Sequence, residues 1–93
     1  MSRNRKKPAT IGDAFKLLDA MIPERDKEFF RSQSAEDFAL GQHFGLGMWI
    51  RNAWIYGADD ATYRALFGDD ILHPDMASAE FLIKYHKHLI QAK

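Results

Sequence analysis

The chain of 93 residues contains no cysteine. It therefore has neither a disulfide framework nor a cysteine-based zinc site. Such an absence suits a reducing compartment, so we expect a cytoplasmic protein. The length allows one domain with a single hydrophobic core, and a hydrophobic content of 46% predicts that the chain folds rather than staying disordered.

Long uninterrupted apolar runs are also missing. The stretch 38–56 approaches the length of a membrane-spanning helix, but it contains Gln42, His43, Arg51 and Asn52. Charged side chains at bilayer depth are energetically costly. The basic N-terminus is followed by no apolar segment, so we do not expect a secretory signal. We therefore expect no membrane partner, and we interpret 38–56 as part of a buried helix.

Sustained alternation of apolar and polar residues is absent as well, so no sheet is predicted. Helical periodicity instead predicts an all-α fold, a compact single-domain bundle of four to five helices at residues 10–93. The longest helix, about 35–56, carries apolar groups around most of its circumference, which indicates that it is central and buried. Helix starts are marked by residues of capping type. These are Thr10, Ser34, Asp59 or Asp60, and Asp75 or Ser78.

The formal net charge is zero, but the two signs are unevenly placed. A flexible basic arm at residues 1–9 carries +4, from Arg3, Arg5, Lys6 and Lys7. Taking these four from the 13 basic residues leaves nine against 13 acidic ones, so the body carries −4. Such an arm can attract nucleic acid through its phosphates. Association with nucleic acid is therefore one alternative for the function.

Motifs for catalysis or metal binding are missing too. The sequence contains no GxSxG, no HExxH and no phosphate-binding glycine loop. His86 and His88 are two residues apart, about 200° around a helix, so they cannot share one ion. We therefore expect no enzymatic activity, no cofactor and no metal.

Aromatic residues, by contrast, are numerous: seven Phe, three Tyr and two Trp. A body this small has difficulty burying all of them, so some should form an exposed patch that binds a partner or a second copy. The candidates for this patch are Phe29, Phe30, Tyr63 and Trp54. The sequence therefore predicts a small protein-interaction domain of an accessory or inhibitor-like kind.

Glycines interrupt the apolar pattern of the predicted central helix. Gly41 and Gly45 lie four residues apart on one side, where the lack of side chains predicts close packing of another helix. A notch that admits a ligand is the alternative. Gly47 points elsewhere and should accommodate a different neighbour. Each glycine weakens a helix by about 1 kcal/mol relative to alanine, so packing must offset this loss.

Arg51 would be largely desolvated in such a helix and would need a partner, since an unpaired buried charge is strongly destabilising. Asp75 is the favoured partner among the later carboxylates, because its turn immediately precedes the last helix. Alternatively, Arg51, Asn52 and His73 form an anion-binding pocket. Two aromatic side chains belong to the same candidate site, Trp49 and Trp54.

Two separated motifs carry a family resemblance: HFGLGMWIRN at 43–52 and HPDMAS at 73–78. The chain resembles a family of small bacterial proteins of unknown function, which share a helix with an HFGLGMWIRN core and a later HPD(D)xS turn. The resemblance covers roughly residues 10–89. It implies a bacterial origin and supports the helical fold, and it implies no activity. The matching positions are His43, Gly45, Gly47, Trp49, Arg51, Asn52, His73, Pro74 and Asp75.

Overall fold

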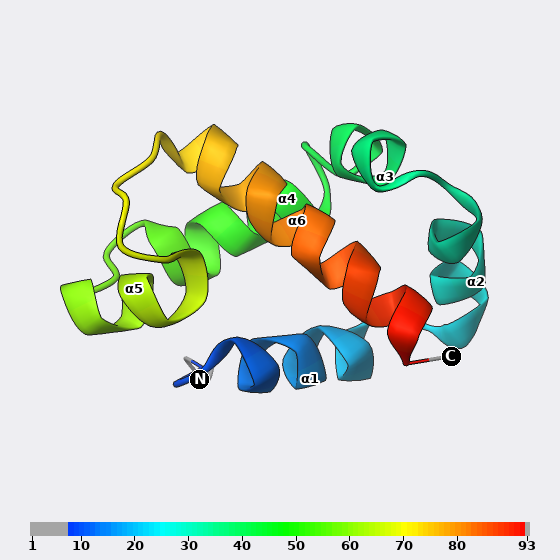
Figure 1. Ribbon diagram of the computed structural model, residues 1–93, viewed down its shortest axis with the longest axis horizontal. Coiled ribbons are helices and arrows are strands. Elements are labelled where there is room, and N and C mark those ends of the chain that lie inside the picture. The colour runs from blue at the N-terminus through cyan, green and yellow to red at the C-terminus, as the bar shows by residue number, and fades with distance from the viewer. Residues whose placement is uncertain (1–7, 93) are drawn as a thin grey trace.

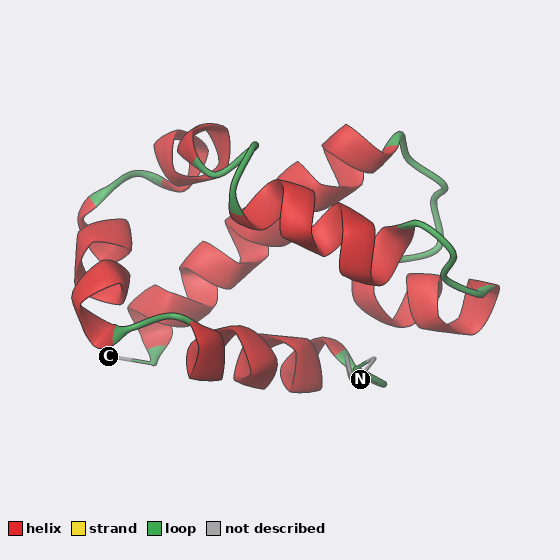
Figure 2. Cartoon of the chain, turned by 180° about the vertical axis from the view of Figure 1, so that it is seen from behind, coloured by secondary structure: helices red, strands yellow, loops and turns green. Residues whose placement is uncertain are grey.

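The computed structural model describes residues 8–92, and every regular element in this range is a helix (Figures 1 and 2). The elements are α1 (Ile11–Met21), α2 (Glu24–Ser32), α3 (Ala35–Gly41), α4 (Leu46–Ile50), the π-helical turn η1 (Arg51–Ile55), α5 (Asp60–Phe67) and α6 (Pro74–Gln91). The predicted all-α fold is confirmed. Residues 1–7, which include the four basic residues of the predicted arm, lie outside the described residues.

Short polar side chains start three of the helices as predicted. Thr10, Ser34 and Asp59 each accept a hydrogen bond from the backbone N–H three residues later, at 2.8 to 3.1 Å. Each bond satisfies one of the N–H groups that a helix leaves without a partner in its first turn. The starts of α1, α3 and α5 are therefore encoded locally.

The start of α6 differs from the prediction. His73 is the N-cap, and its Nδ1 accepts a hydrogen bond from the backbone N–H of Asp75 at 3.1 Å. Pro74 occupies the first helical position, where the missing N–H of proline would have had no partner anyway. The predicted caps, Asp75 and Ser78, lie inside the helix, and their side chains are used elsewhere.

The predicted continuous helix at 35–56 is wrong. It is divided into α3, α4 and η1, with a turn at 42–45 between the first two. The carbonyl of Gln42 accepts hydrogen bonds from the N–H groups of Gly45, at 3.1 Å, and Gly47, at 2.7 Å. Three glycines within seven residues lower the helix propensity, and the chain turns here instead. With this division, residues 8–92 contain six α-helices, above the four to five predicted.

The centre of the fold is α6 instead. This helix of 18 residues contains no glycine, and α2, α3, α4, α5 and η1 all pack on it. Figure 1 shows it crossing the middle of the molecule, with α1 below it and α3 above. Its buried side chains are Ala77, Ser78, Phe81, Leu82, Tyr85, His86 and Leu89.

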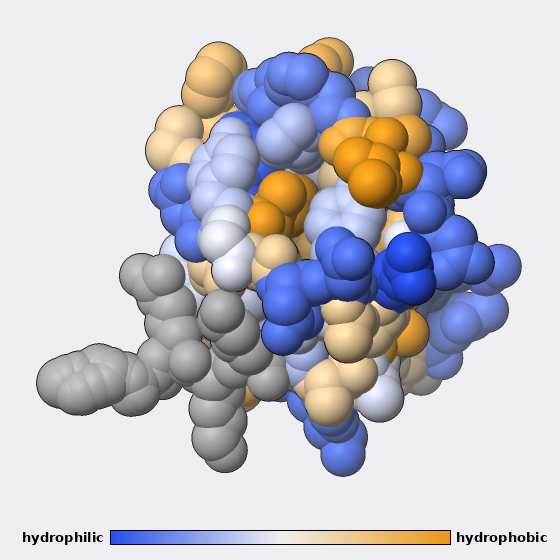
Figure 3. Space-filling model, turned by 90° about the vertical axis from the view of Figure 1, so that its left-hand side faces the viewer, coloured by the Kyte–Doolittle hydropathy of each residue, from blue (hydrophilic) through white to orange (hydrophobic). Residues whose placement is uncertain are grey.

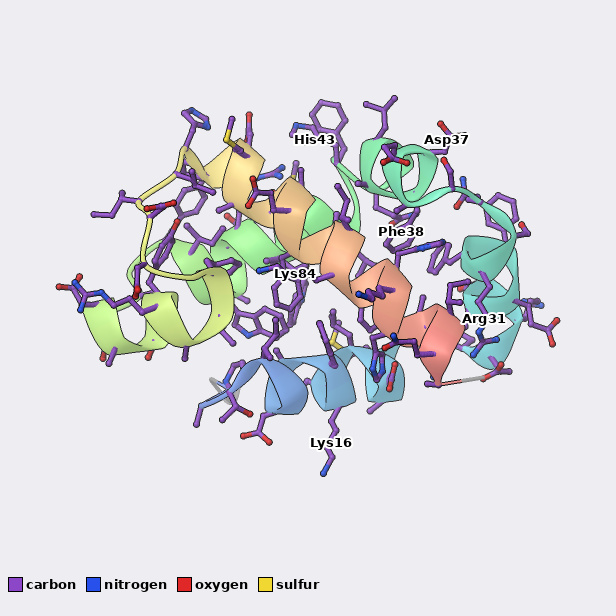
Figure 4. All side chains as sticks on the ribbon, viewed as in Figure 1. Lys16, Arg31, Asp37, Phe38, His43 and Lys84 are labelled. Atoms are coloured by element: carbon purple, nitrogen blue, oxygen red, sulfur yellow. The ribbon has the colours of Figure 1, made fainter. Side chains whose placement is uncertain are left out.

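Aromatic rings join the short helices to α6. Phe81 lies at the centre, with ring centroids 5.5 Å from Phe15 of α1, 5.7 Å from Trp54 of η1 and 5.6 Å from Phe67 of α5. Phe38 points inward from α3 whereas Asp37 points to solvent (Figure 4). Burial of a large apolar side chain contributes about 1.5–3 kcal/mol, so these rings account for much of the attachment of the short helices.

Candidate functional site

Arg51 is buried at the start of η1 and holds two separate segments together. Only 5% of the residue is exposed. Its Nη1 donates to Ser78 Oγ and its Nη2 to the carbonyl of His43, both at 2.9 Å. Its Nε lies 3.5 Å from Asp75 Oδ1. These four residues form what we call the arginine clamp, which connects the 42–45 turn to the first turns of α6.

The clamp contains the predicted pairing of Arg51 with Asp75, but the carboxylate is not the nearest partner of the guanidinium. The two shortest contacts go to a hydroxyl and a backbone carbonyl, while the Asp75 side chain is about half exposed. Ser78 completes the arrangement, since its hydroxyl donates to the backbone carbonyl of Asp75 at 3.1 Å. The guanidinium fork therefore satisfies groups in two directions at once, which the point charge of a lysine cannot do.

The alternative of an anion-binding pocket receives no support from this geometry. Asn52 and His73 are exposed, whereas Arg51 is buried and bonded to groups of the protein itself. Nδ1 of His73 is occupied by the cap of α6. The arrangement therefore favours a structural role for Arg51, with Asn52 outside the clamp.

Of the three glycines, only Gly47 permits a close approach. A Cβ on Gly47 would lie 3.0 Å from the carbonyl oxygen of Gln42, 3.1 Å from Nη1 of Arg51 and 3.6 Å from Leu82 of α6. A Cβ on Gly41 would meet nothing within 4 Å, and one on Gly45 would meet only Gln42. The prediction that Gly41 and Gly45 admit another helix is therefore wrong, and the small residue that the packing requires is Gly47.

Trp54 belongs to the core, and Trp49 is partly buried and packs against it. Trp54 is 1% exposed, and its ring meets that of Trp49 edge-on at 5.1 Å. Its Nε1 has no hydrogen-bond partner among the described residues. Phe30 is also buried and Tyr63 is partly buried. Of the four aromatic candidates for an exposed patch, only Phe29 is exposed.

An apolar groove lies between α3 and α6, and sequence reasoning missed it. Its volume is about 240 Å³, and it is lined by Glu36, Ala39, Leu40, His43, Ala79 and Ile83. Leu40 is 79% exposed, and Phe44, whose ring meets that of His43 at 4.7 Å, is 78% exposed. Both lie in the stretch predicted as one buried helix, and in the structure they face outward next to and within the turn at 42–45.

The opposite end of the molecule has a different surface. Figure 3 shows the face near α5 and the 68–73 loop, where hydrophobic side chains form small patches among hydrophilic ones. Ile71, in that loop, is 91% exposed. Single exposed apolar residues are ordinary on protein surfaces. The gathering around the groove is therefore the feature that needs an explanation.

A second polar cluster joins α1 to α6. Tyr85 donates from its hydroxyl to one oxygen of Asp19 at 2.7 Å, and Nε2 of His88 lies 2.9 Å from the other. Burial acts to raise the pKa of Asp19, but the hydrogen bonds from His88 and Tyr85 outweigh it and leave the pKa below its usual value. Burial, together with the hydrogen bond to Asp19, raises the pKa of Tyr85.

A third set of polar contacts fixes α2 to the end of α6. Nε2 of His86 lies 3.0 Å from the carbonyl of Phe30, and Nε of Arg31 donates to the carbonyl of Leu89 at 3.0 Å. In residues 8–92 no three His, Asp or Glu side chains gather as a metal site would require. The histidines at 86 and 88 are instead used separately, in contacts between helices.

None of the helices in the described range has the length and apolar character needed to cross a membrane.

Comparisons with known proteins identify a family. No curated protein and no solved structure matches the chain. A family described as a domain of unknown function, DUF6794, matches residues 7–89, which include the arginine clamp and the groove. The chain therefore belongs to the DUF6794 family.

Proposed function

We propose that this protein is a small cytoplasmic interaction domain of bacterial origin, without catalytic activity of its own, and that it binds a partner protein through the groove between α3 and α6. Its role would be accessory or inhibitor-like. One observation carries this proposal. Leu40 and Phe44 remain about four-fifths exposed beside an apolar groove, whereas most of the other large apolar side chains among the described residues are buried or partly buried.

The exposed pair contributes little to the fold, because neither side chain is packed in the core. Covering a Leu or Phe side chain with a partner would contribute about 1.5–3 kcal/mol each. Clustered exposed apolar residues of this kind mark interaction sites in soluble proteins. Glu36 lines the groove and Asp37 is exposed next to it, so the surface has a polar rim around an apolar centre, as protein interfaces do.

The test is a binding experiment with substitutions that leave the core intact. The chain is immobilised and exposed to a lysate of the organism that encodes it, alongside the variants Leu40→Glu and Phe44→Glu. Ile71→Glu is the matched control, since it places the same charge on an exposed apolar side chain far from the groove. Retained proteins are quantified by mass spectrometry.

We expect the wild type and Ile71→Glu to retain the same specific protein. With either groove variant, the affinity for this protein should fall at least about tenfold, which corresponds to a loss of about 1.4 kcal/mol of binding free energy. All three variants should melt close to the wild type, because exposed substitutions rarely change stability by more than about 0.5 kcal/mol. If no protein distinguishes the wild type from Leu40→Glu, the groove is not a binding surface.

Association with nucleic acid through the basic arm is the second candidate. It is supported by the +4 charge of Arg3, Arg5, Lys6 and Lys7 in the sequence. Replacing all four by Gln should then abolish binding to a fluorescent duplex, and the wild-type affinity should fall steeply with salt. Equal binding by the wild type and the neutralised chain would exclude this role.

A further inference from the structure

The central helix α6 keeps one apolar side uncovered. Met76, Ile83 and Ile90 follow one another at intervals of seven residues and are 52%, 38% and 48% exposed. Seven residues are close to two turns of an α-helix, so these side chains lie in a line with a spacing of about 10.5 Å. We call these three residues the α6 stripe. Its middle residue, Ile83, also lines the groove described above.

Two opposite charges accompany the α6 stripe on one flank. Glu80 and Lys87 are both exposed and are also seven residues apart. On a helix, each lies within about 60° of Ile83 on the side that faces away from Ala79 and the groove. The flank therefore carries one negative charge in its first half and one positive charge in its second half.

This pattern is complementary to itself when it is reversed. Consider a second copy of α6 laid antiparallel, with Ile83 of both copies at the twofold axis. Met76, seven residues before Ile83, then meets Ile90, seven residues after it. Glu80, three residues before, comes next to Lys87, four residues after. In a parallel twofold pair, the flank that carries Glu80 and Lys87 would lie on opposite sides of the contact in the two copies, so these ion pairs could not form.

We propose that the partner covering the α6 stripe is a second copy of this chain, packed antiparallel along α6. The proposal goes beyond the proposed function, and the two surfaces share Ile83. The contact is isologous: each copy contributes the same residues, and the twofold axis doubles every pair. It consists of Met76 against Ile90 twice, Ile83 against Ile83, and two pairs of Glu80 with Lys87.

The dimer should be weak. A helix of 18 residues is about 27 Å long, so one helix pair buries less surface than a standard stable interface. We expect a dissociation constant on the order of micromolar or weaker, so that the mass of the particle rises with concentration. Covering Ile83 in the dimer would also occupy one wall of the groove, so the dimer and the groove partner would compete.

Charge reversal tests the pairing without disturbing the core. In sedimentation equilibrium of the full chain, Glu80→Lys and Lys87→Glu should each weaken the dimer by about tenfold, since each creates two like-charged pairs in place of two ion pairs. The double variant, which exchanges the two charges, should restore the wild-type affinity. Lys16→Glu is the matched control: Lys16 is exposed on α1 and points away from α6 (Figure 4), so its reversal should change nothing.

Engineered thiols test the direction, because the chain has no cysteine of its own. Under mild oxidation, Ile83→Cys should form a disulfide-linked dimer. Met76→Cys alone should form no disulfide-linked dimer, because Met76 of one copy lies next to Ile90 of the other. A mixture of Met76→Cys with Ile90→Cys should form one. Cross-linking of Met76→Cys with itself would show a parallel pair and overturn the proposal.

Two further results would also overturn it: a wild-type chain that stays monomeric at millimolar concentration, and a double charge variant that fails to recover the dimer. Either result leaves the groove untouched, because a host protein lost with Leu40→Glu would still support the proposed function. If the lysate experiment retains no host protein that depends on Leu40, but the wild-type chain still dimerises, the proposed function is wrong and the dimer proposal stands.

Discussion

Replacing Arg51 with alanine should remove most of what ties the 42–45 turn to α6. The substitution deletes two hydrogen bonds of 2.9 Å from a charged donor, to Ser78 Oγ and to the carbonyl of His43. Hydrogen bonds to charged groups contribute about 1.5–3 kcal/mol each. The ion pair with Asp75 adds little, because that carboxylate is half exposed and regains water. The alanine variant also avoids the cost of burying the guanidinium, so we expect a net loss of about 3 kcal/mol.

The assay is urea unfolding followed by far-UV circular dichroism, together with a thermal melt. In a domain of this size, about 3 kcal/mol corresponds to a fall in Tm of roughly 12–24 °C. Arg51→Lys should lose about 2 kcal/mol, because an ammonium cannot reach in both directions as the guanidinium does. Asp75→Asn should lose less than about 1 kcal/mol.

The order of the stability losses in these variants shows which contact of Arg51 matters most. If the two short hydrogen bonds dominate, the alanine variant is the least stable and Asp75→Asn is nearly neutral. A loss below about 1 kcal/mol for Arg51→Ala, or a loss for Asp75→Asn as large as that for Arg51→Ala, would refute the account of the arginine clamp. In the second case the ion pair, and not the fork, would be the main interaction.

The remaining predictions concern glycine packing and pH. Gly47→Ala should destabilise the chain by about 2 kcal/mol despite the better helix propensity of alanine, because the new Cβ would press on the backbone carbonyl of Gln42. Gly41→Ala should stabilise the chain by about 0.5–1 kcal/mol, because a Cβ there meets nothing within 4 Å. Urea titration measures both changes. The pKa of Asp19 is lower in the folded chain than in the unfolded one, so its contribution is present above the unfolded value of about 4 and is lost as the pH falls through the folded value. Asp19→Asn should therefore flatten the acid limb of the curve of stability against pH. The pKa of Tyr85 is raised by folding, so its contribution is full below about pH 10 and is lost as the pH rises further, and Tyr85→Phe should flatten the alkaline limb.

Local signals in the sequence predicted the helices and several of their starts. The caps at Thr10, Ser34 and Asp59 act within three residues, so a short stretch contains all the information they need. The pairing of Arg51 with Asp75 was also predictable. A buried guanidinium needs a partner, and few carboxylates lie in a turn next to a helix that must pack nearby.

The choice of central helix was not predictable in the same way. Both 35–56 and 74–91 are apolar enough to be buried, and periodicity alone does not say which of them the other helices surround. The deciding contacts join residues far apart in the chain, such as Arg51 with Ser78 and Tyr85 with Asp19. The glycines at 41, 45 and 47 are the local sign that the first candidate breaks, because their low helix propensity opposes the apolar pattern around them.

The break between α3 and α4 connects the arginine clamp to the groove. Arg51 holds the carbonyl of His43, and the next residue is Phe44, one of the two exposed side chains beside the groove. Arg51→Lys should therefore loosen the 42–45 turn while α6 stays folded, and hydrogen exchange should become faster at the amides of Gly45 and Gly47, which bond to Gln42. Asp75→Asn leaves the bond to His43 in place and should not change that exchange. If both variants speed exchange at the turn equally, the guanidinium does not position the groove, and the two features are independent.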